Sequence, residues 1–226
     1  MECCFSGTSV SSIPTYLWLV TKCLNEQVEF KAAQKDNILG YYDTLTPLYA
    51  SFHDDDKTFS LMWTEYDADL SVFHARYLEN QQLFGKNHGV LCQPQTPPPA
   101  NSYTVSTLPW VSFKHFVVHS FENKPYYFPS VEAGMIYTAG DRELLPLSLS
   151  CHHATTDGYH VQLFLTRLQE EIKKLQGERL VKQVQHVYDN VAYVIRTMGM
   201  RSKDVDERVR GAVSIVGLTH KSFSKP

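Results

Sequence analysis

The chain has 226 residues, of which 43% are hydrophobic and 20% are charged, as in ordinary soluble globular proteins. This length allows one sizeable core. The net charge of −3 gives no support for nucleic-acid binding, and the longest apolar stretch, 16–20, is too short to span a membrane. The five cysteines form no C-x-x-C pair and predict neither a disulfide framework nor a zinc site. We therefore expect a reduced, cytoplasmic protein that holds no metal.

The first half of the chain predicts a helix, a strand and a second helix. Apolar residues recur at helical spacing over 11–32, and residues 47–53 alternate as in a strand. The run Asp54-Asp55-Asp56 ends this strand as an acidic turn, because three consecutive carboxylates cannot all face one metal ion. A second helix is expected over 62–83. Four prolines between residues 92 and 101 exclude regular structure there.

The next part of the chain is rich in strand patterns. Strands are expected over 103–106, 113–121, 133–138 and 144–151, and Gly140-Asp141 is a hairpin-turn signal before the last of them. Strands and helices that mix without strict alternation predict an α/β fold, specifically a two-layer sandwich with a mixed β-sheet.

Two helical patterns follow the last strand. Apolar residues at helical spacing over 161–175 predict an amphipathic helix, with Gly177 as its C-terminal cap. The remaining segment, 177–226, carries nine Lys and Arg against five Asp and Glu, whereas the chain before it is acidic. Apolar residues step by four and three over 180–198, which predicts a further amphipathic helix in this C-terminal extension.

The segment between the last strand and its helix, 152–158, reads His-His-x-x-x-Asp-Gly. A neutral imidazole has an ordinary pKa of about 6.5, so at a strand end it can take a proton from a hydroxyl at neutral pH. We therefore expect His153 to act as a general base in acyl transfer. Asp157 would orient the local backbone or hold the loop through a buried ion pair. A histidine-rich strand end without chemistry is the alternative.

Several ordered segments resemble the chloramphenicol acetyltransferase family. Residues 152–160 resemble its active-site signature, and Ser106 with Pro109-Trp110-Val111 resembles its Ser-x-x-Pro-Trp-Val segment. Residues 137–148 resemble its last hairpin, and Phe52-His53 with Thr58-Phe59-Ser60 resembles its Phe-His and Thr-Phe-Ser stretch. The resemblance runs from about residue 11 to residue 176.

The resemblance implies the fold of CoA-dependent acyltransferases and an enzyme that acetylates the primary hydroxyl of chloramphenicol. Acetyl-CoA would be a co-substrate, with no permanently bound cofactor, and no residue is assigned to it. The resemblance further implies His153 as the general base, Ser106 as the donor to the oxyanion and Asp157 as structural support. Phe59 and Trp110 would contact the substrate. A homotrimer with active sites at subunit interfaces is expected, without nucleic acid or membrane.

The sequence also departs from the family pattern. The family's leading segment, with the arginine that pairs with the motif aspartate, is not matched by residues 1–10, so we expect 1–176 to be an acetyltransferase domain that lacks this segment. Glu132 stands where many members carry threonine. Residues 177–226 extend beyond the family's end. Two alternatives therefore stay open: a catalytically impaired remnant that binds CoA or a small molecule, and an acyltransferase for another hydroxylated acceptor.

Overall fold

A computed structural model describes residues 2–4, 13–94, 97–114, 116, 126–140 and 142–197. The chain divides into two compact units, 1–172 and 173–226. The helices are α1 (Ile13–Asn25), the short 3-10 helix η1 (Val28–Lys31), α2 (Leu70–Phe84) and α3 (Gly158–Thr197). Within these ranges no helix has the length and apolar content that a membrane crossing requires.

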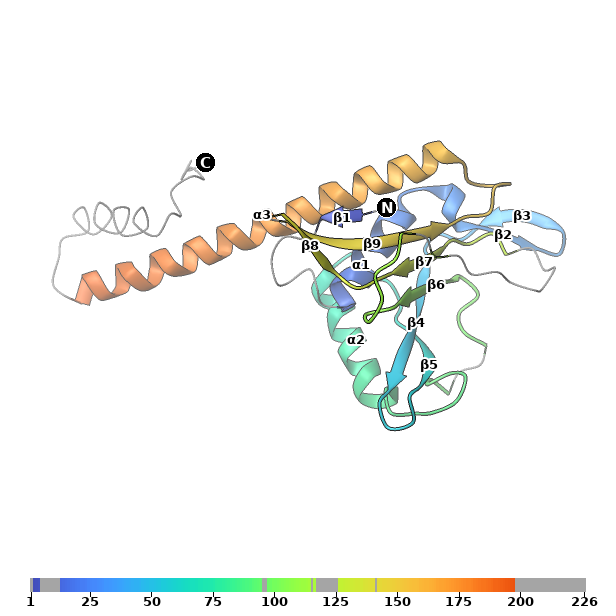
Figure 1. Cartoon of the computed structure of the whole chain (residues 1–226), viewed down its shortest axis with the longest axis horizontal. Helices are drawn as coiled ribbons and strands as arrows, with labels where there is room; N and C mark the ends of the chain where they lie inside the picture. Colours follow the sequence, from blue (N-terminus) through green and yellow to red (C-terminus); the bar gives the residue numbers. More distant parts are fainter. Residues whose placement is uncertain are drawn as a thin grey trace. The chain divides into compact units, whose positions relative to one another are not determined.

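The first unit contains a mixed sheet of seven strands among the residues described (Figure 1). The strands are β1 (Glu2–Cys4), β4 (Thr46–His53), β5 (Thr58–Trp63), β6 (Ser102–Thr107), β7 (Ser130–Ala133), β8 (Tyr137–Ala139) and β9 (Arg142–Ser150). Their order is β1-β9-β7-β6-β4-β5, and β8 pairs with β9. The central strands β4, β6 and β7 run parallel, and the outer pairs are antiparallel. A separate hairpin joins β2 (Ala32–Lys35) to β3 (Ile38–Tyr41).

Helices α1 and α2 pack on one face of this sheet. The buried Tyr103 of β6 shares a hydrogen bond of 2.7 Å with Thr21 of α1, and the ring of Tyr49 on β4 lies 5.5 Å from that of Tyr77 on α2. Because side chains alternate along a strand, the residues between these positions point to the opposite face of the sheet. The predicted α/β architecture with a mixed sheet is confirmed.

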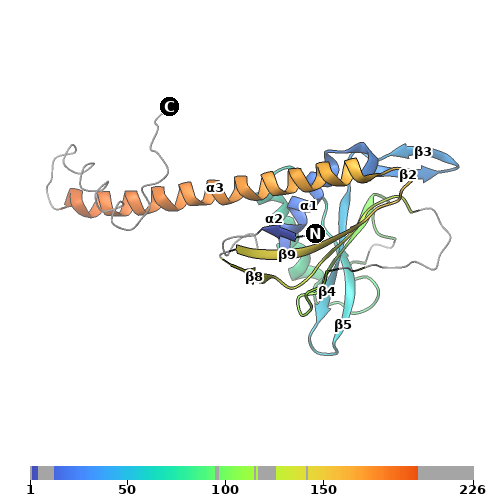
Figure 2. The ribbon, with the colours of Figure 1, turned by 45° about the horizontal axis from the view of Figure 1, so that its top comes forward.

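The first part of α3, residues 158–172, lies beside α1 (Figure 2). Lys22 of α1 forms a hydrogen-bonded ion pair of 2.5 Å with Glu171, and Arg167 pairs with Glu26 just after α1 at 2.7 Å. The buried ring of Phe164 packs edge-on against that of Phe30 in η1, at 6.0 Å. The amphipathic pattern after the motif therefore buries its apolar face against α1 and η1, which fixes where α3 begins relative to the sheet.

Several predicted boundaries are wrong. The helix predicted over 62–83 begins only at Leu70, where Asp69 caps it by accepting a hydrogen bond from the backbone N–H of Ser71 at 2.7 Å. Met62 and Trp63 lie in β5 instead, because their pairing with β4 outweighs a local helical pattern. Gly177 does not end α3, which continues to Thr197. The strand predicted over 113–121 is absent at residues 113, 114 and 116, and its other residues lie outside the described part.

The strand predicted over 133–138 is interrupted, and the hairpin turn after it is confirmed. Gly134 leaves the sheet between β7 and β8, where a Cβ atom would lie 2.9 Å from both the ring of Phe113 and the carbonyl oxygen of Val111. Only glycine allows so close an approach. Gly140 adopts a φ of 66° at the turn between β8 and β9, a conformation that also favours glycine.

Candidate active site

The His-His motif lies in a tight turn between β9 and α3. Strand β9 ends at Ser150, and the backbone N–H groups of Thr155 and Thr156 both donate to the carbonyl oxygen of His152 at 3.1 Å. Helix α3 begins at Gly158. The turn therefore holds both histidines on the surface, where the sheet ends and the helix begins.

The backbone around the turn distinguishes the two imidazoles. Nδ1 of His153 lies 3.3 Å from the carbonyl oxygen of Thr156, and a carbonyl can only accept. This contact is a hydrogen bond when His153 carries its proton on Nδ1, which leaves a free lone pair on Nε2. Nδ1 of His152, in contrast, accepts from the N–H of Ala154 at 3.2 Å, so a neutral His152 carries its proton on Nε2. The exposed His153 is thus the imidazole that can accept a proton outward through Nε2.

Asp157 is the N-terminal cap of α3. Its Oδ1 accepts from the backbone N–H groups of Tyr159 at 2.9 Å and His160 at 3.4 Å. These bonds, first the one from Tyr159, lower the pKa of its carboxyl group. The side chain is 56% exposed and lies 2.8 Å from Nδ1 of His160. Asp157 is therefore not left as an unpaired buried charge, and it orients the backbone that follows the histidines.

Ser106 lies in a polar row that crosses three strands on the face opposite the helices. It pairs with Glu132 of β7, which pairs in turn with Ser148 of β9, and paired residues share a face of the sheet. Ser106 is half-buried, whereas Glu132 is fully buried. Oε1 of Glu132 accepts a hydrogen bond from Ser130, but Oε2 has no partner within the described part of the chain. Burial raises the pKa of this carboxyl group.

Phe59 and Trp110 belong to an aromatic cluster on this same face. Phe59 pairs with Phe52 across β4 and β5, and the ring of Phe52 lies 5.1 Å from that of Trp110. Phe59 and Trp110 are 64% and 66% exposed. The hydrogen bond from Leu108 N–H to the carbonyl of Ala133, at 2.8 Å, holds the segment that carries Trp110 against β7. Apolar surface of this kind is typical of binding sites.

Within a single chain, the predicted site residues lie at different positions along the sheet. The register sets Ser106 opposite Ser148 across β7, whereas His153 follows the end of β9 at Ser150. Phe59 and Trp110 lie with β4 and β5, on the far side of Ser106 from β9. The described contacts join Phe52 to Trp110 and Ser106 to the Glu132 row, but they do not join Ser106 to His153.

A cavity of about 640 Å³ is lined by Tyr127, which contacts His152. The ring of Tyr127 is 4.7 Å from the imidazole of His152, and its hydroxyl donates to Gln34 of β2 at 3.2 Å. Leu48 and Thr104, which line the cavity, are on the same sheet face as Ser106. This volume suits a small molecule. No sequence motif predicts a role for these residues, although the adjacent tyrosines at 126 and 127 mark one of the lining segments.

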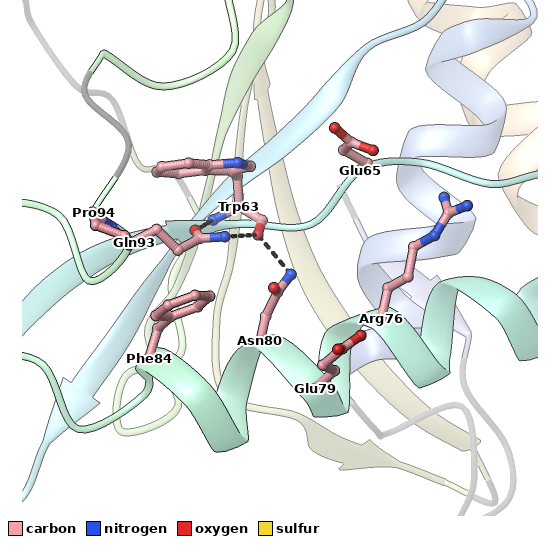
Figure 3. A pocket seen from close by; sticks show the side chains of 8 residues that line it. All are labelled: Trp63, Glu65, Arg76, Glu79, Asn80, Phe84, Gln93 and Pro94. Carbon is pink, nitrogen blue, oxygen red and sulfur yellow. Dashed lines mark hydrogen bonds between the residues drawn. The ribbon is translucent and has the colours of Figure 1, made fainter.

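A second cavity, of about 280 Å³, lies between β5 and α2 (Figure 3). Two of its amide side chains bond to the backbone of Trp63: Gln93 accepts from the N–H at 2.8 Å and donates to the carbonyl at 3.2 Å, and Asn80 donates to the same carbonyl at 3.1 Å. None of the predicted site residues lines it. These bonds give Gln93 and Asn80 a structural role, because they join the loop after α2 and α2 itself to the end of β5.

Comparisons with known proteins point to one family. The sequence model of the chloramphenicol acetyltransferases matches residues 5–169. The chain is 35% identical over 158 residues to a chloramphenicol acetyltransferase of Clostridium perfringens, covering 70% of this chain and 71% of that protein. It is 37% identical over 158 residues to that of Staphylococcus aureus, covering 70% and 72%.

Solved structures show the same fold. A chloramphenicol acetyltransferase superposes with a TM-score of 0.60 at 19% identity, covering 69% of this chain and 74% of that one. A dihydrolipoamide acetyltransferase of Azotobacter vinelandii superposes with a TM-score of 0.53 at 18% identity, covering 76% and 72%. At these identities the similarity concerns the fold, which is that of CoA-dependent acyltransferases.

Proposed function

Because this chain belongs to the chloramphenicol acetyltransferase family, we propose that it transfers the acetyl group of acetyl-CoA to the primary hydroxyl of chloramphenicol, with His153 as the general base. The observation that carries this proposal is the contact between Nδ1 of His153 and the carbonyl of Thr156 at 3.3 Å. It favours the tautomer in which Nε2 offers its lone pair to the acceptor hydroxyl.

The reaction needs only one proton carrier. Nε2 of His153 takes the proton of the hydroxyl as its oxygen attacks the thioester carbonyl, which forms a tetrahedral oxyanion. When this intermediate collapses, the C–S bond breaks, and the imidazolium returns the proton to the leaving thiolate to give CoA. No acyl-enzyme forms, so no nucleophilic serine or cysteine is required. A positioned base of this kind contributes about 10²–10⁴-fold to the rate.

Ser106 supplies the donor to the oxyanion in this proposal. Ser106 is half-buried on the face of the sheet opposite the helices, and its hydroxyl can donate one hydrogen bond. Within one chain, the described contacts do not join Ser106 to His153. The proposal therefore includes a homotrimer, in which a second copy supplies the other residue of this pair at each active site. The exposed pair Phe59 and Trp110 would contact the substrate at this junction.

A second acceptor is favoured by Glu132. A buried carboxylate beside Ser106 would repel a developing oxyanion, and its Oε2 lacks a partner among the described residues. A carboxyl group at this position changes the polarity beside Ser106 and thereby the acceptors that fit there. We therefore keep an O-acetyltransferase for another hydroxylated acceptor as the second candidate.

The direct test is release of free CoA thiol from acetyl-CoA by the purified chain, with and without chloramphenicol. Release that depends on the antibiotic supports the proposal, and His153→Ala should lower the turnover by at least about 10²-fold. His74→Ala on α2 is the matched control and should keep the wild-type rate. Unchanged turnover in His153→Ala would contradict the assigned base.

The other outcomes separate the alternatives. Release with other alcohols or amino alcohols but not with chloramphenicol supports the second candidate. Thermal stabilisation by CoA without any turnover, from a chain that circular dichroism shows to be folded, supports a catalytically impaired remnant. Analytical ultracentrifugation of the same sample measures the homotrimer, and a stable active monomer would contradict shared sites.

A further inference from the structure

Two histidines and an aspartate from separate segments meet near the β4–β5 turn. His53 ends β4, Asp55 lies in the turn that follows, and His88 lies in the loop after α2. The two imidazole rings stack with centroids 4.1 Å apart and planes at 21°. One ligand atom from each of the three residues lies within 4.8 Å of the others. None of them takes part in the proposed acetyl transfer.

We propose that His53, Asp55 and His88 bind one divalent metal ion of the zinc class. Two imidazole nitrogens and one carboxylate oxygen are a ligand set that zinc prefers, and three protein ligands leave a fourth position of the tetrahedron for water. Magnesium and calcium prefer oxygen ligands alone, so this set selects against them.

Neighbouring carboxylates orient the imidazole of His88. Metal-bound histidines are commonly held in this way by a partner on the ring nitrogen that does not bind the metal. Nε2 of His88 lies 3.2 Å from Oδ2 of Asp55, and its Nδ1 lies 3.0 Å from Oδ2 of Asp56. The pairing with Asp56 holds the ring by one nitrogen while the other faces the ligand carboxylate. Asp56 is itself fixed, because its Oδ1 accepts from the N–H and the hydroxyl of Thr58 at 3.0 and 2.7 Å.

His53 is the rigid ligand and the other two are adjustable. Its side chain is buried, and its Nε2 lies 2.9 Å from Oγ of Ser60 on β5. Zinc–nitrogen and zinc–oxygen bonds of about 2.0–2.1 Å place tetrahedral ligand atoms about 3.4 Å apart. The three atoms must therefore close by at most about 1.4 Å. Asp55 and the ring of His88 are exposed, so a tilt of that ring out of the stack can supply this movement.

The charge around the cluster favours a cation. Lys57 pairs with Asp54, which leaves Asp55 and Asp56 facing the two imidazoles. A divalent cation at this point would therefore meet two carboxylates with no lysine or arginine paired to either of them among the described contacts.

The test is isothermal titration of the full chain with zinc chloride near neutral pH, with magnesium chloride as the comparison. We expect one tight zinc site and no magnesium binding there. Asp55→Asn and His88→Ala should each weaken this site by at least about tenfold, and Asp56→Asn by about 10–100-fold. Asp54→Asn makes the same charge change in the same turn without removing a ligand, so it should keep the wild-type affinity.

Cobalt(II) in place of zinc gives an absorption spectrum that depends directly on which side chains coordinate the metal. A tetrahedral site shows intense visible absorption, which His88→Ala should abolish while circular dichroism stays unchanged. Equal weakening by Asp54→Asn and Asp55→Asn would reduce the effect to general electrostatics and overturn the proposal. Zinc binding that His88→Ala leaves intact, or no zinc site in the wild-type chain, would overturn it as well. None of these readouts depends on acetyl transfer.

Discussion

Ser106 and Glu132 lie opposite each other on the neighbouring parallel strands β6 and β7, with their side chains on the same face of the sheet. The serine is half-buried and the carboxylate is fully buried. A hydroxyl that can stabilise a developing negative charge therefore has a potential negative charge as its nearest neighbour across the strands. The protonation state of Glu132 decides which of the two effects dominates at this point.

In the proposed mechanism, Ser106→Ala should lower kcat by about 10²–10³-fold, because it removes one donor to the oxyanion of the transition state. The KM for acetyl-CoA should change little, since the donor acts only once the tetrahedral oxygen forms. Steady-state kinetics of CoA release measure both constants. Thr107→Ala, at the next position of the same strand, is the control and should keep the wild-type kcat. An equal loss in both variants would indicate damage to β6 and not a role of Ser106.

Glu132→Gln should change how stability depends on pH. Burial raises the pKa of Glu132 in the folded chain, so between the unfolded value of about 4.3 and the folded value the folded state holds more protons. The free energy of unfolding of the wild type should therefore fall as pH rises through this window and stay lower above it. Glu132→Gln cannot ionise and should lose this fall. Urea denaturation at a series of pH values measures it.

The control for that series is Glu143→Gln, which removes an exposed carboxyl group from the neighbouring strand β9. It should keep the wild-type pH dependence. If the free energy of unfolding falls with pH by the same amount in Glu132→Gln and in the wild type, another group is responsible for the fall.

Asp157→Ala should loosen the first turn of α3, because two backbone N–H groups lose the oxygen that accepts them. Loss of a helix cap in a chain of this size lowers Tm by about 2–4 °C. Asp157→Asn keeps an accepting oxygen and should keep most of the stability near neutral pH. Differential scanning calorimetry compares the three proteins, and an identical Tm in Asp157→Ala would rule out the cap as a source of stability.

The pH dependence of the cap has the opposite sign to that of Glu132. The backbone hydrogen bonds lower the pKa of Asp157 below its unfolded value of about 3.9. Its contribution is therefore complete above that value and is lost as pH falls through the folded pKa. Asp157→Asn should lack this acid-dependent loss.

Tyr103→Phe should lower the free energy of unfolding by about 0.5–1.5 kcal/mol, because it removes the buried hydrogen bond to Thr21 that joins β6 to α1. The cost stays small because the hydroxyl of Thr21 keeps its bond of 2.6 Å to the carbonyl of Leu17. Chemical denaturation measures the change. Tyr41→Phe, at an exposed position of β3, should leave the free energy of unfolding unchanged. Both variants should keep the wild-type kcat.

Much of the turn that carries the two histidines could be predicted from local sequence. The strand before His152, the helix after Asp157 and the turn at Gly140 all follow from alternation, helical spacing and glycine, which act over a few residues. The resemblance to the family rests on these same short segments. Their order along the chain was enough to predict the fold class, and the role of His153 as the general base stays a prediction.

Other features depended on residues far apart in the sequence. A helical pattern over 62–83 could not show that Met62 and Trp63 pair with β4. No spacing rule could place His88 against His53, 35 positions earlier, or pair Ser106 with Glu132 across two strands. Local patterns decide which way a side chain points on its own element. Which elements become neighbours is decided by the cooperative burial of the whole sheet and its helices, so only the tertiary structure brought the metal-ligand cluster and the Ser106–Glu132 pair together.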